Sequence, residues 1–194
     1  METMNYQKLD ANYYQADINP VKVELGLLKY LSISGQSAPE APVFNQSIAE
    51  IYSVVNALKN HFTQQGNEFE IAPMEANWWV EKGGEFKAIP RTEWFWRILI
   101  PLPEFISATD FENLKNPLKS KVSMEEINEG TSVQILHIGS YEEEDTTIEK
   151  IIDFMGQNQL AMSGYHHEIY LNDPKETPVE ELKTIIRYPV RVKN

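Results

Sequence analysis

The sequence places the same order of predicted elements twice along the chain, in residues 27–103 and again in residues 133–192. Each copy reads as a strand that ends at a turn, an amphipathic helix and two further strands. A unit of this size is too small to bury a sheet face alone, so the copies are expected to dock and share one core or one cleft. We therefore predict an α+β fold of two β-α-β-β repeats, related by a pseudo-dyad with a central ligand cleft. Residues 27–192 are expected to form a single domain, with residues 1–26 as an extension that packs on it.

In the first repeat, the predicted elements are a strand at 27–35, a helix at 44–65 and strands at 77–82 and 93–103. The helix is predicted from apolar residues that recur at steps of three and four. Ser47 and Glu50 match a capping box near its start, and Gly66 lies just past its end. Gly83 and Gly84 mark a turn between the last two strands.

In the second repeat, the predicted strands lie at 133–141, 165–171 and 184–190. Thr146 and Glu149 match a second capping box, which begins a helix that Gly156 is expected to close. Thr177, as an N-cap residue followed by a proline, predicts a short helix before the last strand. A weaker signal of the same kind starts at Thr109.

Composition narrows the functions that such a chain can serve. The 29 acidic and 17 basic residues give a net charge of −12, which repels nucleic-acid phosphates and anionic membrane surfaces. Cysteine is absent, which excludes disulfides, thiolate nucleophiles and cysteine zinc sites. No apolar run approaches the ~18–20 residues of a membrane span, and the first residues do not read as a signal peptide. We expect a soluble cytoplasmic protein that binds neither nucleic acid nor membranes.

Several familiar motifs are missing from the sequence. It has no Walker loop, GxGxxG, GxSxG or HExxH pattern, which disfavours nucleotide hydrolysis, serine-type acyl transfer and zincin chemistry. The residues before Leu27 contain no helix-turn-helix pattern, which disfavours a DNA-binding regulator, and their tyrosines, Tyr6 among them, are expected to pack on the body. The acidic run from Glu142 to Asp145 lacks the spacing of a calcium loop and reads as the solvated start of a helix.

Three stretches of the chain resemble a known family. They are APMEANWWVEK, VQILHIGSYEEEDTTIEKI and GYHHEIYLNDPKETPVEELKTIIRYPV. Together they resemble the GyrI-like small-molecule-binding family, and most closely its stand-alone members, over about residues 27–192. The resemblance implies two β-α-β-β repeats with a ligand groove between them, as in the effector domains of the multidrug-responsive regulators BmrR and Rob. This agrees with the repeat that the element pattern predicts independently.

The resemblance also implies a functional residue. In the effector domains, an acidic residue on the strand that corresponds to YHHEIYL lies at the floor of an aromatic pocket and meets cationic drugs. The matching residue here is Glu168. Some stand-alone members that this chain resembles are cyclopropanoid cyclopropyl hydrolases, which open the strained ring of DNA-alkylating agents of the yatakemycin type.

Strand alternation around Glu168 predicts which residues accompany it. His166, Glu168 and Tyr170 are expected on one face, and the opposite face, which carries two aliphatic residues, is expected to pack against the helices. Rings around a carboxylate remove its hydration and raise its pKa, so Glu168 is predicted to act as the general base. Tyr141 and Tyr170 are expected to donate hydrogen bonds to the water or to the developing oxygen charge.

Aromatic residues are the expected walls of the cleft. Trp79 and Trp96 are the candidates for stacking on a flat ligand, and alternation sends about half of the four tryptophans into the core without settling which half. Glu75 is either a second acid in the cleft or an exposed residue at the start of a strand. His137 fits a ligand pocket and a satisfied position in the core equally well.

Neither a metal nor a cofactor is expected. His166 and the residue after it point in opposite directions along a strand, so they cannot bind one metal ion together. The expected partner is an aromatic or cationic small molecule, and the chain is expected to be a monomer or a weak homodimer. The leading hypothesis is a cyclopropanoid hydrolase that detoxifies its substrate. The alternatives are a non-catalytic multidrug binder and, with less support because no acidic patch is concentrated enough to mimic DNA, a gyrase inhibitor.

Overall fold

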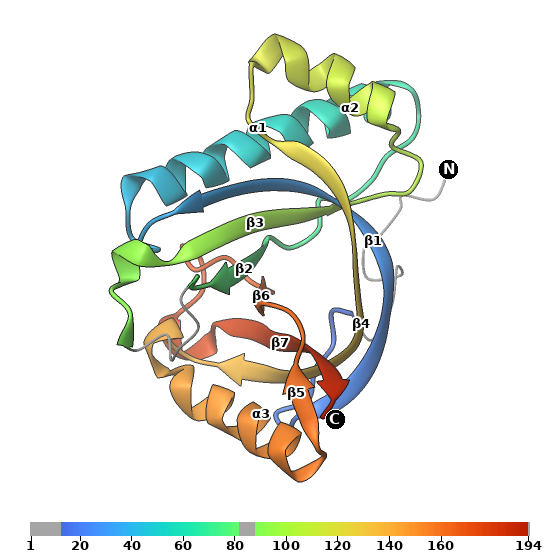
Figure 1. Ribbon diagram of the computed structural model, residues 1–194. Helices are drawn as coiled ribbons and strands as arrows, with labels where there is room; N and C mark the ends of the chain where they lie inside the picture. Colours follow the sequence, from blue (N-terminus) through green and yellow to red (C-terminus); the bar gives the residue numbers. More distant parts are fainter. Residues whose placement is uncertain (1–12, 82–87, 194) are drawn as a thin grey trace. The chain divides into compact units, whose positions relative to one another are not determined.

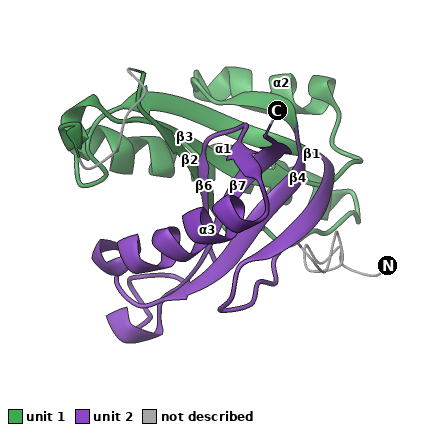
Figure 2. Ribbon diagram, turned by 60° about the horizontal axis from the view of Figure 1, so that its bottom comes forward, with its two compact units in different colours: residues 1–8, 28–127 green, residues 9–27, 128–194 purple. Residues whose placement is uncertain are grey.

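The computed structural model describes residues 13–81 and 88–193. These residues fall into two compact units (Figure 2): unit 1 holds residues 28–81 and 88–127, and unit 2 holds residues 13–27 and 128–193. The predicted glycine turn at Gly83 and Gly84, and Tyr6 of the predicted extension, lie outside the described residues.

Unit 1 is an antiparallel sheet with two helices. Its elements are the second half of β1 (Val21–Gln36), α1 (Pro42–Gln64), β2 (Glu75–Trp79), β3 (Phe95–Leu102) and α2 (Ala108–Lys115). Strand β3 lies between β1 and β2 and pairs antiparallel with both. Helix α1 covers one sheet face, because Phe44 in its first turn packs on Trp78 and Trp96, each with 5.2 Å between ring centroids. The core of unit 1 therefore lies between α1 and this face.

Unit 2 repeats the arrangement. Its elements are most of β4 (Ser123–Ile138), α3 (Asp145–Gln157), β5 (Leu160–Met162), β6 (His166–Tyr170) and β7 (Lys183–Val192). Strand β7 pairs antiparallel with β4 and β6, and its end pairs with the short β5 (Figure 1). Ile151 and Met155 of α3 form an apolar cluster with Ile135 and Ile186 of the sheet. Among the described residues, no helix combines the length and the apolar character that crossing a bilayer requires.

The strand registers make the repeat explicit. In unit 1, Arg97 of β3 lies opposite Ser34 of β1 and Asn77 of β2. In unit 2, Arg187 of β7 lies at the corresponding position, opposite Gln134 of β4 and His167 of β6. The predicted α+β fold is confirmed, and each unit has the predicted order of strand, helix, strand and strand. Strand β5, which lies between α3 and β6 along the chain, was not predicted because it has only three residues.

Both long strands begin earlier than the apolar pattern predicts. Strand β1 starts at Val21 and β4 at Ser123, because their first halves alternate with exposed polar residues instead of forming an apolar run. The strand predicted to reach Tyr141 ends at Ile138, and Tyr141 instead opens the 3-10 helix Tyr141–Glu143. Tyr141 therefore lies outside the strand that carries His137.

Both predicted capping boxes at the main helices are wrong. Helix α1 starts at Pro42, whose fixed φ suits the first helical position, and Glu50 instead accepts a hydrogen bond from the Ser120 hydroxyl at 2.8 Å. Ser47 is buried inside that helix. Helix α3 follows directly on the 3-10 helix, so Thr146 donates its hydroxyl to the Glu143 carbonyl and caps nothing.

The helix ends are partly as predicted. Gly66 follows α1 with φ 80°, a conformation that favours glycine, which confirms its role. Gly156 lies inside α3, and Gln159 takes the left-handed conformation beyond that helix. The helix near Thr109 exists as α2, with a capping box from Ser107 and Asp110 that starts two residues earlier. The short helix after Thr177 is the 3-10 helix Val179–Glu181.

Gly35 of β1 allows the Trp96 ring to approach the backbone. A Cβ atom at Gly35 would lie 2.3 Å from Cζ2 of Trp96, and the ring cannot withdraw because it is almost fully buried. We expect Gly35→Ala to lower the free energy of unfolding by about 1–3 kcal/mol, measured by urea denaturation. Gly26→Ala in the same strand is the control, because nothing lies within 4 Å of its added Cβ. Equal effects of the two changes would show that the Trp96 contact is not responsible.

Candidate functional site

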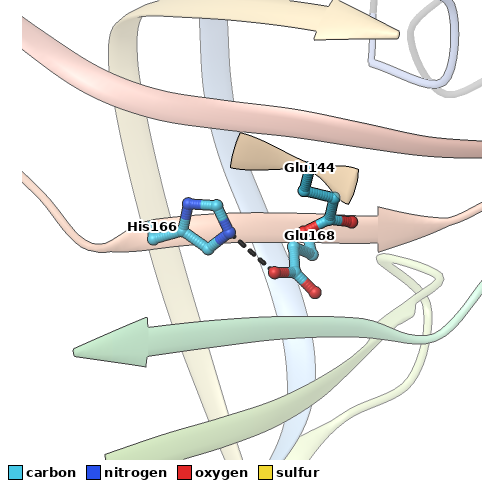
Figure 3. Close-up of side chains that lie close together, drawn as sticks. All are labelled: Glu144, His166 and Glu168. Carbon is cyan, nitrogen blue, oxygen red and sulfur yellow. Dashed lines mark hydrogen bonds and ion pairs between the residues drawn. The ribbon is translucent and has the colours of Figure 1, made fainter. Parts of the chain in front are cut away.

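Three ionisable side chains of unit 2 converge at the start of α3 (Figure 3). Strand β6 supplies His166 and Glu168, which lie two residues apart and therefore on the same face. Glu144 is the residue that precedes α3. One ligand-type atom of each side chain lies within 4.8 Å of the others, and Glu144 and His166 are 7% and 8% exposed. Two carboxyl groups and an imidazole thus share a small, largely buried space.

Glu168 is the acceptor at the centre of a hydrogen-bonded row. Nε2 of His166 lies 2.7 Å from Oε1 of Glu168, and the Tyr170 hydroxyl donates to Oε2 at 2.5 Å. Nδ1 of His166 lies 2.6 Å from the hydroxyl of Tyr188 on β7. Tyr141 packs its ring edge-to-face on Tyr170, with 5.7 Å between the centroids. The predicted neighbours His166, Tyr170 and Tyr141 are thus brought together with Glu168.

The two carboxyl groups have opposite protonation behaviour. Burial and the negative charge of Glu168 raise the pKa of Glu144 to about 10. Burial also opposes ionisation of Glu168, but the hydrogen bonds and charge of His166, together with hydrogen bonds from Tyr170 and Glu144, lower its pKa below the ordinary value. The prediction that burial raises the pKa of Glu168 is wrong, because its neighbours on the strand donate hydrogen bonds to the charged form.

The tyrosines of the site remain neutral. Burial and the charge of Glu168 raise the pKa of Tyr141 to about 12. The same two causes raise the pKa of Tyr188 as well. Both hydroxyl groups therefore keep their protons at neutral pH and are available as hydrogen-bond donors.

The sheet face that carries Glu168 differs from the prediction. Glu168 lies opposite Ile186 in the register, and Ile186 packs with Ile151 of α3. Glu168 is therefore on the helix-covered face, at its edge where α3 begins. The prediction considered only the two aliphatic residues of β6. It failed because the neighbouring strands place a larger apolar cluster on the face that carries Glu168, and α3 packs on that cluster.

His137 has a clear position in unit 2. It is 4% exposed, its Nδ1 lies 2.9 Å from Oγ1 of Thr147, and its Nε2 lies 2.9 Å from the Ser140 carbonyl oxygen. These contacts join the end of β4 to the 3-10 helix and to α3. Of the two alternatives for His137, the satisfied buried position agrees with these contacts, and the residue supports the segment that carries Tyr141 and Glu144.

The other predicted residues lie in unit 1. Trp96 is 1% exposed and donates its Nε1–H to the Ser37 hydroxyl, so its ring is part of the core and presents no free face for stacking. Trp79 is half-buried and stacks on Phe95 at 5.7 Å, next to a small pocket. That pocket is lined by Gln36, Val80, Glu81, Ile89, Glu93 and Phe95. Glu75 is fully buried, which contradicts the exposed alternative.

Sequence reasoning missed Glu144. It stands third in an acidic run whose other members are all exposed, so the pattern indicated only a solvated helix start. The available signal was a spacing. Tyr141 and Glu144 are three residues apart, which places them on one side of a helical turn. Tyr188 was also missed, because it lies in a strand that reads as purely structural.

A second ionic group lies on the opposite face of the sheet in unit 2. Arg187 is fully buried, and its Nη1 lies 3.1 Å from Oε2 of Glu129, whose Oε1 lies 2.8 Å from Nδ1 of His167. Arg187 also donates to the Gln134 side chain and to the Tyr13 carbonyl. Arg187 thus ties Tyr13 to β7, and Gln134 donates to the Gln15 carbonyl, so the group helps to hold the segment before β1 in place.

Glu129 is expected to make stability depend on acid pH. Burial opposes its ionisation, but the charges of and hydrogen bonds from His167 and Arg187 lower its pKa from 4.5 to about 2. The unfolded chain then binds a proton more readily, so this stabilisation is complete above pH 4.5 and is lost as the pH falls toward 2. We expect a loss on the order of 3 kcal/mol over that range, measured by urea unfolding at several pH values. Glu129→Gln should flatten the dependence, and an unchanged slope would contradict the assignment.

The comparisons with known proteins agree with this architecture. The family model of the GyrI-like small molecule binding domain matches residues 20–191. A conserved Listeria innocua protein of solved structure is 25% identical, with a TM-score of 0.90 over 97% of this chain and 100% of its own. A hydrolase encoded by lin2189 of the same organism is 24% identical, with a TM-score of 0.86 over 98% and 100% of the two chains. The C-terminal domain of EcmrR has the same fold at 12% identity, with a TM-score of 0.64 over 90% and 98%. A search of curated protein sequences gives no match.

Proposed function

The chain belongs to the GyrI-like small-molecule-binding family. From this premise we propose that it is a hydrolase of aromatic small molecules and that Glu168 is its reactive residue. The observation that carries the proposal is the row of His166, Glu168 and Tyr170 on β6, with a second carboxyl group against it. The Listeria hydrolase of the same fold supports hydrolysis as the class of reaction. The substrate we propose is a cyclopropanoid DNA-alkylating agent, so the biological role is detoxification.

The protonation states decide what Glu168 does. A carboxylate offers about four lone-pair positions, and His166, Tyr170 and Glu144 occupy three of them, which leaves one for a water molecule. A carboxylate of lowered pKa is a weak base, but it holds and orients that water well. The strain of a three-membered ring conjugated to a carbonyl supplies the driving force that a strong base would otherwise provide.

The reaction balances with one water molecule. The water oxygen forms a bond to the cyclopropane methylene, and the ring C–C bond breaks with its electron pair moving into the conjugated ring. The carbonyl oxygen of that ring becomes a phenolate and takes a proton from solvent. Glu168 accepts the proton that the water loses and returns it to solvent. Tyr141, a residue that is 39% exposed, provides aromatic surface beside the reacting group and a neutral hydroxyl donor.

A second function uses the same groups without chemistry. One ionised carboxylate next to the rings of Tyr141 and Tyr170 is also suited to binding an organic cation. In that case Glu168 pairs with the charge of the ligand and no bond is formed.

Mass spectrometry separates the two functions. The protein is incubated with a yatakemycin-type agent, and the products are compared with those of an incubation without protein. A product one water heavier, formed at a rate proportional to protein concentration, is the expected result. Saturable binding of the agent or of a cationic dye without that product would overturn the hydrolase proposal in favour of the binder.

A further inference from the structure

We infer that Glu144 is the second functional carboxyl group of the site: it holds the one proton that the pair carries and donates it to Glu168, which keeps Glu168 the anion. Glu144 is thus a positioning residue for the water-binding carboxylate. The catalytic consequence of this role rests on the proposed function, but the shared proton itself does not.

Burial and contact geometry place one proton on the pair. The two side chains adjoin in a space where Glu144 is 7% exposed and the Glu168 side chain is 13% exposed. Two carboxylates this close, with little water to screen them, cannot both be charged near neutral pH. One of them is therefore neutral and carries a proton.

The donors around the pair decide which carboxyl group is neutral. Glu168 receives hydrogen bonds from His166 and Tyr170, and both stabilise a negative charge. Oε1 of Glu144, by contrast, receives no hydrogen bond from any described residue. The proton accordingly resides on Glu144, whose carboxyl group lies beside that of Glu168 (Figure 3).

The internal repeat shows that the fold does not require these carboxyl groups. Trp78 lies opposite Trp96 in unit 1, as Glu168 lies opposite Ile186 in unit 2. At the start of α1, Phe44 packs on Trp78, whereas Glu144 at the start of α3 adjoins Glu168. Rings fill this place in one unit and a carboxyl pair fills it in the other. Buried carboxyl groups cost stability relative to apolar packing, so their presence in unit 2 points to a function.

Other ionisable groups also face the pair, and any titration experiment must distinguish their titration from that of Glu144. They are His166 and Tyr170 of β6, Tyr188 of β7, Tyr141 of the 3-10 helix, Asp145 of α3 and, near Tyr141, Asp173. Their separation requires a probe that reports on glutamate carboxyl groups alone.

Carbon-13 NMR of protein labelled at the glutamate side-chain carboxyl carbon is such a probe. In the wild-type protein we expect one glutamate to stay neutral through neutral pH and to titrate near pH 10. The signal should be absent from Glu144→Gln, and in Glu168→Gln the remaining Glu144 should titrate at lower pH because the neighbouring charge is gone. Glu142→Gln, a change at an exposed position of the same acidic run, should leave the signal unchanged.

The results that overturn the inference are specific. The inference is overturned if all wild-type glutamates titrate in the acid range, or if the alkaline titration persists in Glu144→Gln. Glu168→Gln provides the second test if Glu144→Gln does not fold, because a signal near pH 10 that stays unshifted in Glu168→Gln also overturns it. A wild-type signal near pH 10 without any turnover would refute the proposed hydrolase and leave the shared proton intact.

The pH profile of turnover supplies a readout that a purely structural role would not move. Ionisation of Glu144 next to Glu168 places a second charge in the site, so kcat/KM should fall about tenfold per pH unit above pH 10 in the wild type. Glu144→Gln keeps a neutral donor and cannot ionise, so its profile should lack that alkaline limb. An identical limb in both proteins would overturn the positioning role.

Discussion

Glu168→Gln is expected to lower kcat/KM for water addition by about 10²–10⁴-fold. The amide keeps the shape of the side chain, but it carries no charge, cannot accept a proton from water and offers one acceptor oxygen where the carboxylate offers two. His166 and Tyr170 both donate to that carboxylate, so one of them loses its acceptor as well. The measurement is the initial rate of formation of the hydrated product with a yatakemycin-type agent.

The control for this substitution is Glu142→Gln. It removes the same charge from the chain at an exposed position and should leave kcat/KM within twofold of the wild type. Far-UV circular dichroism and urea unfolding establish that both variants are folded. Unchanged turnover in a folded Glu168→Gln protein would remove Glu168 from the mechanism.

Arg187→Met is expected to lower the free energy of unfolding by about 3–5 kcal/mol. The substitution leaves Glu129 buried with a charge that His167 alone must balance. It also removes the hydrogen bonds to Gln134 and to the Tyr13 carbonyl, and the contact of the guanidinium with the Tyr13 ring at 4.2 Å. Urea denaturation followed by tryptophan fluorescence measures the loss.

The internal repeat offers a matched control for Arg187. Arg97 lies at the corresponding position of unit 1 and pairs with Glu125 at 3.0 Å, but the two side chains are 22% and 31% exposed. Water screens this pair, so Arg97→Met should cost less, about 1–2 kcal/mol, mostly through the lost hydrogen bonds to the buried Asn77 side chain. Equal losses for the two substitutions would contradict the assignment of the large effect to burial. Adding Glu129→Gln to Arg187→Met should recover part of the stability, because the uncompensated charge is then absent.

The local features of the site were predictable. A period of two residues along β6 places His166, Glu168 and Tyr170 on one face, and the structure confirms that they contact one another. The helix over residues 42–64 and the repeat of elements followed from apolar spacing in the same way. Each of these features depends on residues close together in the sequence, where backbone geometry alone sets the direction of a side chain.

Features that depend on distant residues were not predictable. Glu144 and Glu168 meet because the chain just before α3 lies beside β6 in the folded protein, and nothing in the acidic run distinguishes the buried member from the exposed ones. The burial of Trp96 depends on Gly35 in another strand. The pKa of Glu168 was predicted in the wrong direction because the number of donors around a carboxyl group is a tertiary property.

The sequence by itself therefore determined the α+β class and the repeated order of elements, and its resemblance to a known family pointed to the strand that carries Glu168. The first two conclusions follow from short-range periodicity, which the backbone converts directly into faces and turns. Only the tertiary structure decided that Glu168 lies on the helix-covered face, that a second glutamate adjoins it, and which of the two holds the proton. Charge states in a nearly buried site depend on which donors and charges surround each group in space, and that arrangement exists only after the strands and helices have packed.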